Sequence, residues 1–322
     1  MILLADAQVT FHDHKPKQLS LYDAVIDGFS RQQKSLQPKF FYDERGSHLF
    51  DQICDQPEYY LPTVERRLLL KHRQRIADLI GKERIVIEPG AGSLAKIRLL
   101  LNQLQADVYV PMDISADYLQ SACDKLAEDF PELGIHAVCV DISHSMPLPN
   151  GLSNSPRVVF FPGSSLGNFH YHEALQFLSM IRKTIGHNGM LLIGVDTKKP
   201  VEILNAAYND AAGVTAEFNL NLLHRIQSEL DSELNVDNFD HHAFYNSDKG
   251  RIEMYLVSQC DQRVRIGSHD FEFKSGERVH TECSYKYSAE EFLGLARQAD
   301  LEPVEHWLAD DELFGMYLLK SV

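Results

Sequence analysis

Between residues 85 and 195, short apolar runs alternate with segments whose apolar residues recur at helical spacing. The segment LAKIRLLLNQL, for example, places Leu94, Ile97, Leu100, Leu101 and Leu104 on one helix face. Alternation of this kind predicts βαβ units, in which helices cover both faces of a parallel sheet. It limits this part of the chain to an α/β fold. The apolar runs are RIVIEPG (84–90), DVYVPMD (107–113), GIHAVCVDI (134–142), RVVFFPGS (157–164) and GMLLIGVD (189–196).

A different pattern occupies residues 198–287. One helical stretch (200–230) precedes three strand-like runs, which predicts α+β structure with antiparallel hairpins. The α/β pattern then resumes with a helix that has Ser288 as its N-cap, followed by two strands. At 322 residues the chain can form two domains. We predict one domain over 61–197 and 288–322, and an inserted domain over 1–60 and 198–287.

Composition excludes several classes of function. The formal net charge of −15 opposes binding to phosphate backbones, so we expect no nucleic-acid partner. No apolar run approaches the ~20 residues of a membrane span, and residues 1–10 lack the features of a secretory signal. The five cysteines are odd in number and contain no C-x-x-C pair. These features favour a cytoplasmic protein that acts on a small molecule, and we expect it to be a monomer.

A glycine-rich turn, VIEPGAGSLAK (86–96), follows the first strand of the α/β region. Gly90 and Gly92 allow the backbone to approach a ligand that a Cβ atom would exclude. Asp113 ends the next strand, where a carboxylate can accept both protons of a ribose diol. The motif also matches G-x-G-x-x-A, so an NAD-dependent dehydrogenase remains an alternative.

Three features favour S-adenosylmethionine over NAD. Glu88 directly precedes the glycine turn, where class I methyltransferases usually carry an acid. Asp141 ends the third strand and can accept from an adenine amino group. The chain closes in helix, strand, strand, as expected for the antiparallel hairpin of a seven-stranded methyltransferase sheet. We include Lys96, at the end of the turn, among the cofactor-binding residues. The alternative for Asp113 and Asp141 is a merely solvated strand end.

Six segments together resemble the histidine-specific, S-adenosylmethionine-dependent methyltransferases, which make Nα-trimethylhistidine for ergothioneine biosynthesis. They are YDERGSHLFDQICDQPEYY (42–60), EPGAGS (88–93), FPGSSLGNF (161–169), AAYNDAAGVTAEFN (206–219), RIEMYL (251–256) and HTECSYKY (280–287). The resemblance covers nearly the whole chain. One departure is YYLPTVE (59–65), where the family has an arginine-containing segment.

The resemblance implies a class I, Rossmann-like methyltransferase sheet with an inserted α+β substrate-binding domain, and S-adenosylmethionine as cofactor. It implies methylation of the α-amine of L-histidine to the trimethylated betaine. Tyr42 and the Gly163 carbonyl would act at the amine, beside Phe50. Further substrate-binding residues would be Tyr59, Asn168 and Tyr208 at the carboxylate, and Met254 in the pocket wall. Aromatic faces suit this reaction because they hold a quaternary ammonium well.

Glu282 and Ser284 lie two residues apart in a predicted strand and therefore share a face. A carboxylate and a hydroxyl match the two nitrogens of an imidazole, which makes them candidates for the side-chain pocket. His280 and Lys286 would lie on the same face, so periodicity alone also allows a solvated strand face.

Other functions remain open at this stage. The histidine pairs at 12–14 and 241–242 lack a further ligand at helical spacing, so we expect no catalytic metal. The substrate could be another amino acid or a dipeptide. The chain could also be a catalytically silent binding module.

Overall fold

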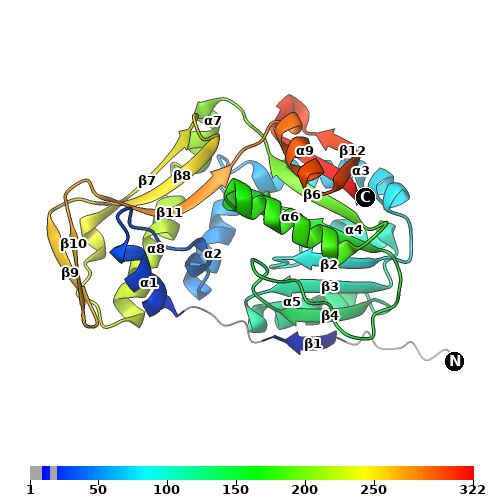
Figure 1. The fold of residues 1–322 in the computed structure, drawn as a ribbon, viewed down its shortest axis with the longest axis horizontal. Helices are drawn as coiled ribbons and strands as arrows, with labels where there is room; N and C mark the ends of the chain where they lie inside the picture. Colours follow the sequence, from blue (N-terminus) through cyan, green and yellow to red (C-terminus); the bar gives the residue numbers. More distant parts are fainter. Residues whose placement is uncertain (1–8, 15–19) are drawn as a thin grey trace. The chain divides into compact units, whose positions relative to one another are not determined.

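The computed structural model describes residues 9–14 and 20–322, which form two compact units (Figure 1). The sheet unit comprises described residues 9–14, 63–197 and 287–322, and the hairpin unit comprises 20–62 and 198–286. Residues 1–8 and 15–19 lie outside the described residues. They include most of the segment in which we expected no secretory signal, and part of the predicted substrate-binding domain. Over the described ranges, no helix combines the length and apolarity that a membrane crossing needs.

An eight-stranded sheet forms the centre of the sheet unit, with strand order β1-β4-β3-β2-β5-β6-β13-β12. All neighbours are parallel except β13, which runs antiparallel to both β6 and β12. Without β1, and numbered along the chain, the order is 3-2-1-4-5-7-6. This confirms the predicted α/β sheet and its terminal hairpin. The strands are β1 (Val9–Asp13), β2 (Ile85–Pro89), β3 (Val108–Asp113), β4 (Gly134–Cys139), β5 (Arg157–Phe161), β6 (Met190–Asp196), β12 (Leu301–Leu308) and β13 (Phe314–Ser321).

The edge strand β1 differs from the prediction, which assigned residues 1–60 to the inserted domain. Val9–Asp13 instead pairs in parallel with Ile135–Cys139 of β4 and adds an eighth strand to the sheet. The pairing joins residues far apart in the chain, so no local pattern in the sequence reveals it. The remaining boundaries lie within two residues of those expected.

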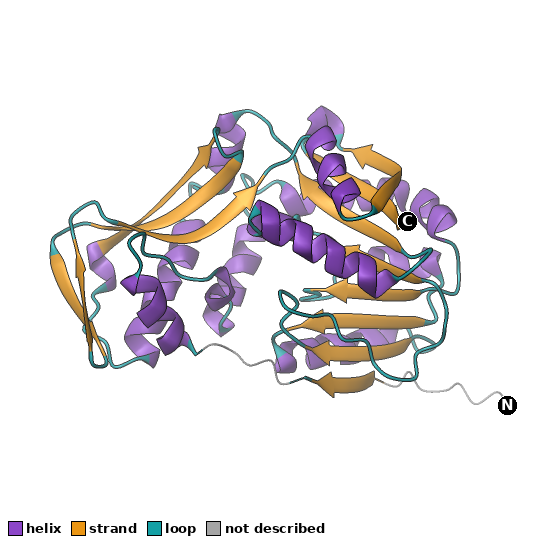
Figure 2. Cartoon of the chain, in the orientation of Figure 1, coloured by secondary structure: helices purple, strands orange, loops and turns teal. Residues whose placement is uncertain are grey.

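Helices flank this sheet as the alternating pattern predicts. They are α3 (Leu61–Ile80), α4 (Arg98–Leu104), α5 (Ala116–Asp129), α6 (Tyr171–Ile185) and α9 (Ala289–Gln298), with short 3-10 helices η2 (Ser165–Asn168) and η4 (Asp310–Glu312). The helix α5 packs on β3 and β4, and α6 packs on β5 and β6 (Figure 2). Ser288 caps α9 as predicted. Its hydroxyl accepts a hydrogen bond from the Glu291 amide, and the Glu291 carboxylate accepts one from the Ser288 amide.

The hairpin unit combines antiparallel strands with helices. A three-stranded sheet has the order β11-β8-β7, and β9 and β10 form a separate ribbon. The helix α8 packs on β7 and β8, and α2 packs on α8. Its elements are α1 (Leu21–Ser30), η1 (Pro38–Phe41), α2 (Glu44–Cys54), α7 (Val201–Ala207), α8 (Val214–Glu229), η3 (Val236–Asn238), β7 (Phe239–Asn246), β8 (Arg251–Ser258), β9 (Gln262–Ile266), β10 (His269–Phe273) and β11 (Arg278–Tyr285).

The predicted helical stretch 200–230 is interrupted between α7 and α8. The Asp210 carboxylate accepts bonds from the amides of Val214 (2.7 Å) and Thr215 (2.8 Å) and so caps the start of α8. A second helix begins here, after Gly213 with φ of 75°, and Tyr208 lies at the end of α7. Tyr208 is thereby held at a turn and buried in the core of the hairpin unit.

Candidate active site

The glycine turn lies at the carboxyl end of β2 and is tied to the end of β3. Gly90 and Gly92 have φ values of 65° and 54°, which glycine adopts without strain. The Gly92 amide donates to Oδ2 of Asp113 (3.0 Å), and the Ser115 amide donates to Oδ1 (3.0 Å). Burial raises the pKa of Asp113 above its usual range, although these backbone donors partly oppose the shift. The turn and Asp113 therefore form one rigid structure.

Asp141 lies just beyond the end of β4. Its Oδ1 accepts from the amide (3.0 Å) and the hydroxyl (2.5 Å) of Ser143. The strands β2, β3 and β4 are parallel neighbours, so their carboxyl ends meet at one edge of the sheet. A glycine-rich turn with two carboxylates at such an edge fits a nucleoside with a ribose diol and an amino group. These residues are therefore suited to hold S-adenosylmethionine.

Glu88 lies in β2, two residues before Gly90, and is almost completely buried. Its carboxyl group accepts a hydrogen bond from the Tyr109 hydroxyl (2.5 Å). Burial raises the pKa of Glu88 to about 8, against the opposing effects of the Tyr109 bond and the Lys96 charge. The group is thus mostly protonated at neutral pH, and Tyr109 is a support of the turn that sequence analysis missed.

Lys96 and Gly163 share a partner that sequence analysis also missed, the carboxylate of Glu65 on α3. The ammonium of Lys96 lies 2.6 Å from Oε2, and the amide of Gly163 donates to Oε1 at 2.8 Å. Gly163 has φ of 86°, and a Cβ atom there would lie 3.1 Å from Lys96 Nζ. The sequence offered one signal for Glu65: it is an acidic residue between Val64 and Leu68, both of which lie on the buried face of an amphipathic helix. Asn168 ends η2 and is exposed.

In the hairpin unit, the ring of the predicted catalytic residue Tyr42 and three predicted substrate-binding rings form a continuous series. The ring centroids lie 5.7 Å apart for Tyr42 and Phe50, 6.4 Å for Phe50 and Tyr59, and 6.1 Å for Tyr59 and Tyr208. Tyr42 is 40% exposed at one end of the series, whereas Tyr208 is buried at the other. Burial raises the pKa of Tyr59 well above its usual value, and the charge of Glu282 adds to the shift.

The remaining predicted residues lie on β8 and β11 of the same unit. Glu282 is directly opposite Met254 in the strand register, and Ser284 is opposite Ile252. Ser284 and Lys286 are buried, so the alternative of a solvated strand face is wrong for them. The environment of Glu282 raises the pKa of its carboxyl group to about 7, because desolvation outweighs the nearby Lys286 charge.

The expectation that His280 shares the face of Glu282 is wrong. A β-bulge between these two residues shifts the register, so that His280 is opposite Tyr255 and Glu282 is opposite Met254. Tyr255 and Met254 are consecutive and point to opposite faces of β8. His280 therefore lies on the other face, where its ring contacts Tyr255 with centroids 5.2 Å apart.

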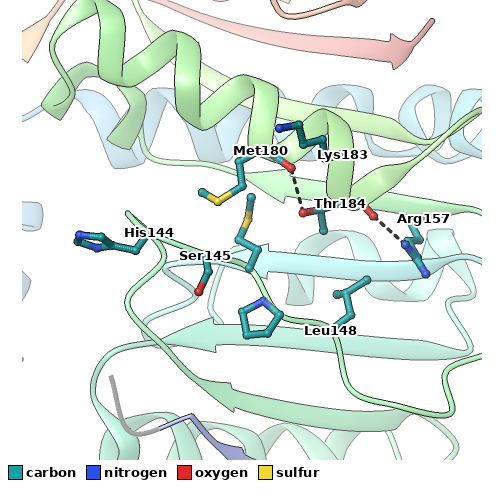
Figure 3. Close-up of a pocket in the computed structure, with 9 residues that line it drawn as sticks. His144, Ser145, Leu148, Arg157, Met180, Lys183 and Thr184 are labelled. Atoms are coloured by element: carbon teal, nitrogen blue, oxygen red, sulfur yellow. Dashed lines mark hydrogen bonds between the residues drawn. The ribbon is translucent and has the colours of Figure 1, made fainter. Parts of the chain in front are cut away.

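A cavity of about 440 Å³ in the sheet unit is lined by nine residues, among them His144, whose ring lies 3.5 Å from the Asp141 carboxylate (Figure 3). It lies beside Arg157, the first residue of β5, and the last turns of α6, where Arg157 donates to the Thr184 carbonyl (2.9 Å). The glycine turn follows the opposite, carboxyl ends of the strands, and no predicted site residue lines the cavity. Among residues 9–14 and 20–322, no group of three or more His, Cys, Asp or Glu side chains could hold a metal ion.

Comparison with known proteins identifies the family of this chain. The family model described as "Histidine-specific methyltransferase, SAM-dependent" matches residues 21–321. The chain is 37% identical to a histidine N-alpha-methyltransferase of Mycolicibacterium smegmatis, over 91% of this chain and 92% of that protein. It is 35% identical to the protein of the same name from Mycobacterium tuberculosis, over 93% and 94% of the two chains.

A fungal relative matches over part of its length. The chain is 31% identical to ergothioneine biosynthesis protein 1 of Neurospora crassa, over 89% of this chain and 33% of that protein. The family match favours the methyltransferase prediction over an NAD-dependent dehydrogenase. This chain is therefore an enzyme of the histidine-specific methyltransferase family, whose methyl donor is S-adenosylmethionine.

Proposed function

We propose that this enzyme methylates the α-amino group of L-histidine, and that repeated transfer yields the trimethylated betaine. The observation that carries the proposal is the pair Glu282 and Ser284 on one face of β11, with Glu282 close enough to Tyr59 to affect its pKa. A carboxylate and a hydroxyl on one face complement the two ring nitrogens of histidine. The names of the three relatives support the same substrate and an ergothioneine pathway.

The sheet unit supplies the residues for the cofactor. Asp113 accepts from the ribose hydroxyls and Asp141 from the adenine amine, while Gly90 and Gly92 let the backbone approach, with Glu88 before the turn and Lys96 beside it. When bound, S-adenosylmethionine supplies an electrophilic methyl group, so the chain's own task is to align the amine with it.

The substrate amine and carboxylate need separate partners. Tyr59, Asn168 and Tyr208 donate hydrogen bonds to the carboxylate, and the Gly163 carbonyl accepts from the amine. An α-amine is largely protonated at pH 7, so its proton must leave before transfer. Tyr42 holds the water that accepts it.

Quaternisation changes what the pocket has to hold. The product ammonium has no hydrogen to donate after the third transfer. The rings of Tyr42, Phe50 and Tyr59 then contribute about 0.5–2 kcal/mol each by cation–π attraction. Met254 forms the wall opposite Glu282.

The direct test incubates the pure protein with S-adenosylmethionine and each amino acid in turn, and reads product masses. Histidine should gain up to three methyl groups, whereas the other amino acids should remain unmodified. Methylation of a different amino acid, with histidine unchanged, would overturn the substrate assignment. S-adenosylhomocysteine should raise the melting temperature and NAD should not, because only a ligand of the native state stabilises it.

Histamine tests the carboxylate partners separately. It lacks the carboxylate of histidine, so the donors that should bind this group would be left unpaired at a cost of about 1–3 kcal/mol each. Turnover of histamine should therefore be very slow. A rate close to that of histidine would contradict the roles of Tyr59, Asn168 and Tyr208.

A further inference from the structure

Lys286 is a buried cation that contacts two residues of the proposed substrate pocket. It directly follows β11, and its side chain is 1% exposed. Its ammonium nitrogen lies 2.9 Å from the hydroxyl oxygen of Ser284 and 3.2 Å from that of Tyr208. All three residues belong to the hairpin unit. The same ammonium also favours the ionised form of Glu282.

The direction of these hydrogen bonds is fixed by chemistry. An ammonium group has three donors and no acceptor. The hydroxyl oxygens of Ser284 and Tyr208 must therefore accept, and each hydroxyl proton must point to another acceptor. Throughout the described part of the chain, the buried Ser284 hydroxyl has no acceptor for its own proton. A ligand atom with a lone pair would satisfy it.

Glu282 has the opposite hydrogen-bonding requirement. Its carboxyl group accepts no hydrogen bond from any residue that the structure describes, and an ionised carboxylate can only accept. A ligand approaching β11 therefore meets one acceptor and one donor, two residues apart. Burial of a lysine is costly unless its charge is compensated, and a structural role in this core needs no charge.

We propose that Lys286 is a specificity-determining, positioning residue: by donating to Ser284 it makes that hydroxyl a donor, so the pocket selects the neutral imidazole. The neutral ring carries one N–H, which donates a hydrogen bond to Glu282, and one lone pair, which accepts a hydrogen bond from the Ser284 hydroxyl. The imidazolium carries two N–H groups and would set one of them against the Ser284 donor. This inference rests on histidine being the substrate.

The test compares histidine with ring-fluorinated histidine, whose imidazole stays neutral, at pH 6.5, where about half of free histidine carries the charged ring and part of Glu282 is ionised. In Lys286→Met, the Ser284 hydroxyl can rotate and accept a hydrogen bond from an N–H of the charged ring, and Glu282 has lost the nearby cation. The kcat/KM of the variant for histidine should fall about 10- to 100-fold, chiefly through KM. For each protein, the kcat/KM for histidine is divided by the kcat/KM for the fluorinated analogue. This ratio should be about tenfold higher in the variant than in wild type.

Two further variants separate this role from a structural one. Lys34→Met removes a partly buried cation of the hairpin unit, which pairs with Glu277, and should leave the ratio unchanged. Ser284→Ala should reduce the effect of Lys286→Met on the ratio, because contacting residues that act together are not additive. If Lys286→Met does not fold, Lys286→Gln, which keeps one donor but adds an acceptor, should raise the ratio less but measurably.

The outcomes are distinct. Wild-type protein that does not methylate histidine overturns the proposed function and this inference together. Wild-type protein that does so, with the ratio unchanged in a folded Lys286 variant that binds S-adenosylhomocysteine normally, overturns the role of Lys286 alone. An equal change in Lys34→Met also overturns it, since the effect would then be a general one of lost charge.

Discussion

The carboxylate of Glu65 lies 2.6 Å from the ammonium of Lys96 and is itself buried. Through its other oxygen it accepts from the Gly163 amide, so one side chain of α3 connects the end of the glycine turn to the loop after β5. Both connected residues belong to the proposed site. Glu65 is therefore a support for two loops that the sequence places far apart.

Glu65→Gln should lower the free energy of unfolding by about 1–3 kcal/mol, because the amide still accepts from Gly163 but leaves the Lys96 charge without its partner. Urea denaturation measures the change. The matched control is Glu305→Gln, which breaks the exposed pair with Arg75 and should not shift the midpoint. Equal effects of the two substitutions would contradict a supporting role for Glu65.

Asp113→Asn should weaken binding of S-adenosylhomocysteine by about 1.5–3 kcal/mol, the usual contribution of hydrogen bonds to a charged group. The amide oxygen can still accept from Gly92 or Ser115, but the amide nitrogen then faces the other backbone donor, so the melting temperature of the ligand-free variant checks that the turn keeps its conformation. Isothermal titration calorimetry gives the affinity. Asp129→Asn on α5, which changes an acid paired with Arg98, is the control. Unchanged affinity in Asp113→Asn would show that the ribose assignment is wrong.

Glu88 should make the ligand-free protein less stable as the pH rises. Its pKa is about 8 in the folded protein, against an ordinary value of 4.5. The folded state therefore holds the proton more tightly, and the stabilisation is complete below pH 4.5 and lost as the pH rises through 8. Glu88→Gln mimics the protonated form and should abolish this loss.

The measurement is the free energy of unfolding of both proteins between pH 5 and pH 9. The free energy of unfolding of Glu88→Gln, relative to that of wild type, should increase with pH. The total increase should be a few kcal/mol, at about 1.4 kcal/mol for each unit by which the pKa is shifted. Curves that remain parallel over this range would mean that Glu88 is already ionised in the folded protein.

The kcat/KM for histidine should depend on the ionisation of Glu282. A carboxylate accepts the ring N–H only when ionised, and the pKa of Glu282 is about 7. Activity should thus rise as the pH increases through 7, since kcat/KM reports groups of the free enzyme. Titration of free histidine affects wild type and Glu282→Gln alike. The ratio of their kcat/KM values for histidine therefore reports the ionisation of Glu282 alone. A ratio that is constant with pH would refute the assignment.

Glu282→Ala should change substrate preference. It should lower kcat/KM for histidine by about 10- to 200-fold, through the loss of roughly 1.5–3 kcal/mol. It also removes the carboxylate that an apolar ring would leave unpaired, so activity toward tryptophan or phenylalanine should rise relative to histidine. The check is the histidine-to-tryptophan ratio of kcat/KM, with cofactor binding as the control for folding. If this ratio does not change, Glu282 does not contact the substrate ring.

Local patterns determined the central features of this protein. Alternating apolar runs predicted the parallel sheet, because strands buried on both faces must be apolar throughout. Ser288 marked the start of α9, since a cap involves only neighbouring residues. The glycine turn and Asp113 indicated a nucleoside site, because the carboxyl ends of neighbouring parallel strands meet at one edge of the sheet.

Long-range packing decided the rest. The strand β1 joins β4 across more than 100 residues of chain, and no pattern within Val9–Asp13 names its partner. The bulge beside Glu282 turned His280 to the other face, because one extra residue reverses a period of two. Glu65 and Lys286 were ordinary charged residues in the sequence. Only the tertiary structure buries them against Gly163 and Ser284, because the burial of a side chain depends on neighbours from distant parts of the chain.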